Sequence, residues 1–332
     1  MRIALDGMGG DKAPVVEVAG AIDAARDLRG CEIILVGDED ALKNEPSKYK
    51  PCPANITIRH ATEVVTMSDA ATSPIRRKKD SSISVCVDMV KNKEADAMVS
   101  AGNTGAVVCA AVYTLGLLPG VERPGIAIVF PTLKGPAMIL DVGANIDPKP
   151  NHLLQYGLMA DAYAKRILGK PNPTIGLLNV GEEVTKGTDF VKETHKLLSE
   201  SRVNFIGNVE GRDIYAGKSD VIVCDGFVGN VVLKVSESVA FTMFEFLKRE
   251  LKGSFMARLG VFLGKSAFKA FRKKMDYAEY GGAPLLGING VVIISHGSSN
   301  QKAIKNAIRV ASEFKDRGVN EEILQEIEKW RR

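Results

Sequence analysis

The stretch VSAGNTGA, residues 99–106, joins one apolar run to another through a short polar break. The run Ala95–Val99 has the composition of a buried strand, and it stops abruptly at Ser100. The residues that follow are small, and two of them are glycines. Small side chains let backbone N–H groups meet an anion where a helix begins. The stretch is therefore either a plain turn or a strand-to-helix junction that binds an anion.

Short β-rich runs alternate with helical patterns along the whole chain. The predicted strands are Ile3–Leu5, Glu32–Val36, Asn55–Arg59, Asp96–Val99, Ile126–Phe130, Ala137–Leu140, Ile175–Asn179, Asn204–Ile206, Val221–Cys224 and Val291–Ile294. The predicted helices include Val15–Leu28, Ser82–Asn92, His152–Leu168, Thr188–Glu200 and Gln301–Lys315. Several of these strands are apolar on both faces, as strands covered on both sides are. We therefore predict an α/β fold with a mainly parallel sheet between helices.

Length and composition allow a large core and argue against several classes of protein. The chain has 332 residues, of which 45% are hydrophobic, so it can bury a substantial core. Its five cysteines are widely spaced, unlike a disulfide framework or a zinc site, and favour a reducing cytoplasm. The start lacks the apolar core of a secretory signal, and the most apolar long window, Gly105–Leu118, is too short to span a bilayer. We expect a cytoplasmic protein without a transmembrane helix.

An apolar run followed by Gly with Asn, Ser, Asp or Thr recurs at five further predicted strand ends. These are LDGMGGD (5–11), LDVGAN (140–145), LNVGEE (178–183), CDGFVGN (224–230) and SHGSSN (295–300). The carboxyl ends of parallel strands form the ligand crevice, so all six loops are expected to converge on one edge. Any one of them is explained equally well as an ordinary turn with a helix cap. Six together predict an amide-rich lining suited to a small anion such as phosphate.

Motifs for other chemistries fail on spacing or context. GMGGDK (7–12) has Lys12 where a dinucleotide fingerprint needs its third small residue. GVFLGKS (260–266) has three residues between its glycines where a P-loop has four, and it lies in a helical segment. The four histidines are scattered, and only His296, within SHGSSN, is expected in the crevice. No cofactor, metal or nucleic acid is therefore expected.

A set of long, ordered motifs closely resembles the bacterial phosphate acyltransferase family, the acyl-carrier-protein:phosphate transacylases of phospholipid synthesis. The motifs are DGMGGD, SAGNTGA, LDVGAN, NVGEE, CDGFVGN, GGAPLLGINGVVIISHGSS and RRKKDSS at 76–82. The resemblance implies synthesis of acyl phosphate from an acyl carrier protein thioester and inorganic phosphate. It also implies that a membrane glycerol-3-phosphate acyltransferase consumes the product. The fold implied is the three-layer α/β/α core of phosphotransacetylases and the isopropylmalate dehydrogenase group, as a homodimer.

Two alternatives stay open beside acyl transfer. One is an NAD-dependent dehydrogenase on the related fold, which the missing nucleotide fingerprint disfavours. The other is a non-enzymatic membrane scaffold, suggested by a basic segment and disfavoured by the six polar strand ends. With acyl transfer as the leading hypothesis, we expect one catalytic α/β unit over residues 1–332, with a helical excursion over residues 238–276.

We expect phosphate to attack the thioester carbonyl directly, so that positioning and charge stabilisation dominate catalysis. The predicted phosphate-binding residues are Ser100, Asn103, Thr104, Ser298, Asn300 and Lys12. The predicted catalytic residues are Asn145, Asn179, Asn230 and His296. Each Asn has a plain alternative as a helix cap or turn residue. Asp6 and Asp225 are expected to orient a backbone loop or Lys12, and Cys224 to be structural, because no cation adjoins it in sequence.

Two basic segments predict acidic partners. The run Arg76, Arg77, Lys78 and Lys79 is expected to dock the acidic carrier protein or to contact the phosphate of its prosthetic group. The second segment, residues 248–274, carries nine basic residues and one acidic residue, a net charge of +8. It accounts for the positive sign of the whole chain, whose formal net charge is +4. The rest of the chain therefore carries −4.

The second basic segment also carries an apolar pattern. The residues expected to contact an anionic membrane are Leu251, Phe255, Leu259, Phe262 and Leu263. Their recurrence at near-helical spacing, among cations, predicts a peripheral membrane tip. An ordinary buried stripe or a dimer contact is the alternative.

Overall fold

The computed structural model describes residues 1–332 except 46–52, 254, 276–280 and 332. Within this part of the chain, eleven strands form one sheet in the order β3-β2-β1-β4-β11-β10-β5-β6-β9-β7-β8. The strands are β1 Arg2–Asp6, β2 Glu32–Gly37, β3 Ile56–His60, β4 Ala97–Ser100, β5 Gly125–Thr132, β6 Gly135–Leu140, β7 Thr174–Leu178, β8 Asn204–Val209, β9 Val221–Val223, β10 Ala283–Leu286 and β11 Val292–Ile294. The helices of the body are α1 Val15–Asp27, α2 Glu39–Asn44, α3 Ser73–Arg76, α4 Ser82–Lys91, α5 Thr104–Thr114, α6 Pro150–Arg166, α7 Asp189–Glu200, α8 Asp213–Ala216, α12 Gln301–Asp316 and α13 Val319–Arg331.

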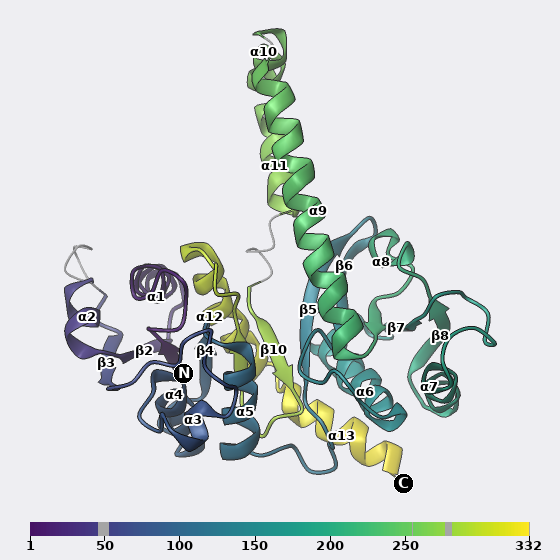
Figure 1. The fold of residues 1–332 in the computed structure, drawn as a ribbon, viewed down its shortest axis with the longest axis horizontal. Helices are drawn as coiled ribbons and strands as arrows, with labels where there is room; N and C mark the ends of the chain where they lie inside the picture. Colours follow the sequence, from purple (N-terminus) through teal and green to yellow (C-terminus); the bar gives the residue numbers. More distant parts are fainter. Residues whose placement is uncertain (46–52, 254, 276–280, 332) are drawn as a thin grey trace.

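The sheet consists of two parallel halves that run in opposite directions. One half contains β1 to β4 and β11, and the other contains β6, β9, β7 and β8. Between the two halves lie β10 and β5. β10 is antiparallel to both β11 and β5, and β5 forms an antiparallel hairpin with β6, the first strand of the second half. Figure 1 shows the two halves on either side of the molecule, with β10 in the middle.

The core lies on both faces of the sheet, which makes the fold three-layered. Alternation along β1 places Ile3 and Leu5 in one buried cluster and Ala4 in the other. Helices α1, α6, α12 and α13 cover the first face, and α4 and α5 cover the second. The prediction of a mainly parallel sheet between helices is confirmed.

Some elements could not be read from local pattern. β10 follows two glycines and contains Pro284, which is unfavourable in a strand interior, so only its antiparallel partners on both sides define it. α13 begins directly after Gly318, which has a φ of 62° and separates it from α12.

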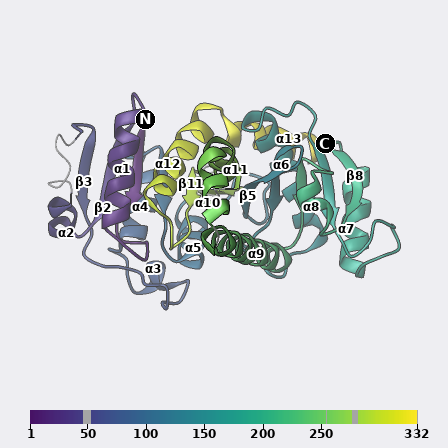
Figure 2. The ribbon, with the colours of Figure 1, turned by 90° about the horizontal axis from the view of Figure 1, so that it is seen from above.

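A helical arm projects from the body (Figures 1 and 2). It consists of α9 Gly226–Gly253, α10 Phe255–Leu263 and α11 Lys265–Met275. Residues Gly226–Leu251 are long and apolar enough to cross a membrane by length and composition alone, and the expectation of no transmembrane helix stays a prediction. One such helix is weak evidence for a span, and the first turns of α9 line the cavity described next.

Candidate functional site

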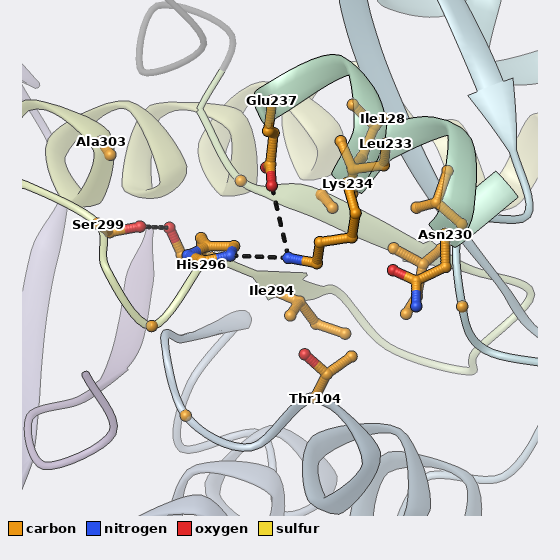
Figure 3. A pocket seen from close by; sticks show the side chains of 18 of the residues that line it. Thr104, Ile128, Asn230, Leu233, Lys234, Glu237, Ile294, His296, Ser299 and Ala303 are labelled. Atoms are coloured by element: carbon orange, nitrogen blue, oxygen red, sulfur yellow. Dashed lines mark hydrogen bonds and ion pairs between the residues drawn. The ribbon is translucent and has the colours of Figure 1, made fainter. Parts of the chain in front are cut away.

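A cavity of about 520 Å³, here called the central cavity, lies where the two halves of the sheet meet. Five of the six strand-end loops contribute to its lining, through Asp11, Thr104, Gly143, Asn230 and His296. Figure 3 shows Thr104, Asn230 and His296 around one space although they come from three different loops. The predicted convergence therefore holds for these five loops.

The sixth loop, after β7, lies elsewhere. Asn179 is not among the described residues that line either cavity discussed here. Its Oδ1 accepts from the backbone N–H of Val180 at 2.8 Å, and its Nδ2 donates to the Lys186 carbonyl at 3.2 Å. The expected convergence is wrong for this loop, because β9 separates β7 from β6. The catalytic role of Asn179 stays a prediction.

A buried carboxylate, Asp6, shapes the loops of the first half. It accepts from the Ser100 hydroxyl at 2.6 Å and from the Met8 backbone N–H at 3.1 Å. Burial raises its pKa, while the hydrogen bonds oppose this. Ser100 is itself buried and accepts from the Gly102 N–H at 3.0 Å, so its hydroxyl lies within the protein. Its placement makes Ser100 a residue that positions the loop, and direct phosphate binding by it stays a prediction.

Asp141 has the same position in the second half, directly after β6. Its side chain accepts from four backbone N–H groups, those of Ile126, Gly143, Ala144 and Asn145, at 2.7 to 3.0 Å. Burial raises its pKa, and the four hydrogen bonds oppose this. The tight turn at Gly143, with a φ of 136°, is thereby fixed beside Asn230.

Asn145 turns its amide into the protein. Its Nδ2 donates to the Pro124 carbonyl at 2.5 Å and to the Tyr156 hydroxyl at 2.7 Å. It lines a second cavity and not the central one. The geometry gives Asn145 a positioning role, and its predicted contact with the reacting atoms remains untested.

Asn103 caps the helix that the opening stretch begins. Its Oδ1 accepts from the Ala106 N–H at 3.0 Å. Its Nδ2 lies 3.1 to 3.3 Å from three carbonyls of the segment 66–69. The cap leaves the exposed Thr104, the first residue of α5, facing the central cavity. Phosphate binding by the Asn103 side chain stays a prediction.

The remaining predicted phosphate ligands lie outside the lining. Asn300 caps α12, with its Oδ1 accepting from the Ala303 N–H at 3.0 Å. Ser298 contacts His296, and Lys12 is exposed. Neither Ser298 nor Lys12 is among the described residues that line the central cavity.

Two charged lining residues that the sequence pattern did not predict, Lys234 and Glu237, come from α9. Lys234 Nζ lies 3.0 Å from His296 Nε2 and 3.5 Å from Glu237 Oε2 (Figure 3). The other ring nitrogen of His296, Nδ1, lies 2.7 Å from the Ser298 hydroxyl. The spacing in the sequence could have predicted Lys234, because it follows Asn230 by four residues and therefore lies on the same face of a helix. This spacing went unused because the excursion was expected to begin only at residue 238.

The predicted carrier-docking run divides into one tied and three exposed cations. Lys78 Nζ donates to Asp69 at 2.6 Å and to the Val64 carbonyl at 2.7 Å. The bond from Lys78 lowers the pKa of Asp69 to about 2. Arg76, Arg77 and Lys79 are exposed at the end of α3 and after it.

Cys224 is buried at the end of β9. Its thiol donates to the Asp141 carbonyl at 3.5 Å, and burial raises its pKa well above the ordinary range. A thiol held neutral in this way is a poor nucleophile, which supports its interpretation as structural.

The predicted membrane residues lie along the arm. Phe262 and Leu263 are 73% and 76% exposed, and Leu251 is half-buried. The side chains of Phe255 and Leu259 lie outside the described residues.

Comparisons with known proteins agree over nearly the whole chain. The model of the family described as fatty acid synthesis protein matches residues 1–322. The phosphate acyltransferase of Geotalea uraniireducens is 52% identical over 328 residues, covering 99% of this chain and 94% of that protein. The phosphate acyltransferase of Geobacter sulfurreducens is also 52% identical, with the same coverage.

Two solved structures share the fold at low sequence identity. A phosphotransacetylase from Streptococcus pyogenes has a TM-score of 0.61 and 20% identity, with 94% of this chain and 93% of that chain covered. The EutD phosphotransacetylase from Staphylococcus aureus has a TM-score of 0.60 and 16% identity, with 95% of this chain and 94% of that chain covered. Together with the family match and the curated relatives, the conclusion is that this chain belongs to the fatty acid synthesis protein family.

Proposed function

We propose that this chain is an acyltransferase that moves a fatty acyl group from an acyl carrier protein thioester to inorganic phosphate, giving acyl phosphate for phospholipid synthesis. The observation that carries the proposal is the composition of the central cavity. The α5 N-terminus at Thr104, the Lys234 ammonium and the Asn230 amide face one space. Helix N-termini and cations hold anions, and the names of the curated relatives supply the acyl group.

The reaction needs little proton transfer. A phosphate oxygen attacks the carbonyl carbon, a C–O bond forms, the C–S bond breaks, and the thiolate leaves with the electron pair and is protonated by solvent. Charge builds on the carbonyl oxygen in the transition state, where Lys234 and Asn230 stabilise it. Thr104 and the first turn of α5 hold the phosphate in reach. His296 completes the site by holding Lys234 at 3.0 Å.

The remaining predicted residues act in this proposal by positioning. Ser100, Asn103 and Asn145 hold the loops that carry the lining. Ser298 holds His296, Asn300 caps α12, and Lys12 adds a cation outside the lining. The exposed cations of the run 76–79 attract the acidic carrier protein.

The test is one incubation of the purified protein with acyl carrier protein thioester and phosphate, with acyl phosphate and free carrier thiol as readouts. We expect both products only when phosphate is present. Lys234→Met should lower kcat by about 100-fold, the usual effect of losing a charge-stabilising donor. Lys248→Met is the matched control, because Lys248 lies on the same helix and pairs with Glu245 outside the cavity. Turnover of a nicotinamide cofactor in place of acyl transfer would support the dehydrogenase alternative.

We also propose that the arm brings this cytoplasmic enzyme to an anionic membrane, where a membrane glycerol-3-phosphate acyltransferase consumes the product. The exposure of Phe262 and Leu263 supports a tip that enters the interface, with Lys265 and Lys269 meeting head groups. Vesicle binding that weakens with salt is the expected result.

A second copy of the chain is proposed to cover the rest of the arm. Five exposed apolar residues recur every four positions along α9, namely Val231, Val235, Val239, Met243 and Leu247. A continuous exposed stripe of this kind marks an interaction surface. Sedimentation of the full chain should give a dimer, and a monomer at micromolar concentration would contradict this part of the proposal.

A further inference from the structure

A second cavity, of about 470 Å³, adjoins the central cavity. The two share Gly105, at the start of α5, and Gly143, in the turn after β6. Both glycines lie near the start of α5 or beside it, so the two cavities border one another there. A molecule lying in the second cavity is therefore next to the cavity assigned to the reaction.

The walls of the second cavity are mostly apolar. Ile75 from α3, Val108 and Val112 from α5, and Leu117 from the segment after it contribute to the lining. Such walls suit a slender, uncharged chain better than a second phosphate ion.

The cavity nevertheless carries one uncompensated cation. Arg123 and Glu122 are the two charged residues among the described lining residues. Glu122 is engaged, because its carboxylate accepts from Asn151 at 2.6 Å and lies 3.2 Å from His152 Nε2. Arg123 is exposed and has no hydrogen bond or ion pair with any residue that the structure describes. Its guanidinium is free to bind an anionic group of a ligand.

The cavity also reaches the surface proposed for the carrier protein. Ile75 lines it, and Arg76 and Arg77 follow in the chain with exposed side chains. The second cavity is therefore lined in part by α3, the helix at whose end the basic run begins.

We propose that the second cavity holds the phosphopantetheine arm that presents the thioester, and that Arg123 binds the phosphodiester of that arm. The inference rests on the proposed function. A thioester carried by a docked protein needs a slender path from the surface to the reacting carbonyl, with room for an anion at its outer end and for an uncharged chain of methylene and amide groups along its length. The second cavity provides apolar walls, a free cation and a border with the central cavity at Gly105 and Gly143. The central cavity is left to phosphate and the acyl group.

The first experiment varies the substrate and Arg123 together. Arg123→Gln is assayed with acyl carrier protein thioester, with acyl phosphopantetheine, and with acyl pantetheine, which lacks the phosphate. We expect KM to rise about tenfold for the first two substrates and to stay unchanged for acyl pantetheine and for inorganic phosphate. Arg123→Lys should recover part of the loss. Arg202→Gln, which removes an exposed cation before β8, is the matched control.

The outcomes separate this inference from the proposed function. If the wild-type protein forms no acyl phosphate from any thioester, the proposed function fails. If it does, and Arg123→Gln leaves all four KM values unchanged, Arg123 does not bind the arm. An equal rise for acyl pantetheine would also overturn the inference, because the effect would then be independent of the phosphodiester.

Cys109 provides a test that does not depend on turnover. It is half-buried and lines the second cavity, whereas Cys31, Cys86 and Cys224 are buried. The protein is labelled with methyl methanethiosulfonate in the absence of phosphate, so that no turnover occurs. Mass spectrometry then measures the rate of labelling of the peptide that contains Cys109. Acyl carrier protein thioester should slow labelling at least fivefold, and the same carrier without its prosthetic group should not. Equal protection by both carriers, or none by either, would overturn the assignment.

Discussion

The loops at the central cavity and the helical arm differ in which side chains they bury and which they expose. In the loops, polar groups turn inward: Asp6 and Asp141 are fully buried and hold backbone N–H groups. In the arm, large apolar groups turn outward, and Phe262 is 73% exposed. A buried carboxylate whose hydrogen bonds are all made needs no partner outside the chain, whereas an exposed apolar stripe marks a surface that binds another molecule. The loops are therefore expected to govern stability and the arm to govern association.

Removal of Asp141 tests the loops most severely. Asp141→Ala leaves four buried N–H groups without their acceptor, so we expect the free energy of unfolding to fall by about 4 kcal/mol or more. Urea denaturation followed by circular dichroism measures the change. Asp141→Asn, which keeps one acceptor oxygen, should lose less.

A matched control is Asp189→Ala, at an exposed carboxylate on α7. It should change stability by less than about 0.5 kcal/mol. Comparable losses at Asp141 and Asp189 would contradict the view that the turn depends on its buried acceptor.

Glu17 should make stability depend on pH. It is buried on α1, its pKa is raised by burial to about 7 from 4.5, and Oε2 has no partner among the described residues. The unfolded chain ionises first as pH rises, so the free energy of unfolding should fall from pH 4.5 to 7, by about 3 kcal/mol in total. Glu17→Gln should flatten this slope in urea titrations at pH 5.5 and 8. The exposed Glu193→Gln should keep the wild-type slope, and an unchanged slope in Glu17→Gln would refute the assignment.

Asn103→Ala should cost about 1 kcal/mol, the usual loss for an N-cap. We also predict that the substitution raises the KM for phosphate far more than the KM for the thioester, because α5 begins at the lining residue Thr104. Melting temperature and phosphate dependence are compared in one preparation. A fall in stability with an unchanged KM for phosphate would make Asn103 a cap alone.

Charges placed on the arm should have the smallest effect on stability. Phe262→Glu with Leu263→Glu should abolish binding to anionic vesicles while the dimer, the soluble activity and the melting temperature persist. Val239→Glu, at a side chain that is 55% exposed, should dissociate the dimer. Calorimetry, sedimentation and vesicle flotation separate these results. Unfolding by either change would show that the arm is part of the core.

The sequence predicted the architecture better than the orientation of polar side chains. An apolar run such as Ile3–Leu5 becomes a buried strand whichever strands it pairs with, so the hydrophobic pattern alone is enough to locate it. Whether an Asn in such a loop caps a helix or lines a cavity depends on its tertiary neighbours, as Asn103 and Asn230 illustrate. The same limit hid Lys234, which reaches the cavity only because α9 begins at Gly226. β10 was missed because its strand character comes from β5 and β11.

α9 runs without interruption from the lining residues Asn230 and Lys234 to Gly253 at the outer part of the arm. A helix of 28 residues is about 40 Å long and stiff over that length. It therefore acts as a fixed spacer, so that whatever the outer end touches stands at a set distance from the central cavity. A tilt imposed at the outer end would also move the Lys234 ammonium, so any contact that the arm makes is coupled through one rigid helix to the geometry of the cavity.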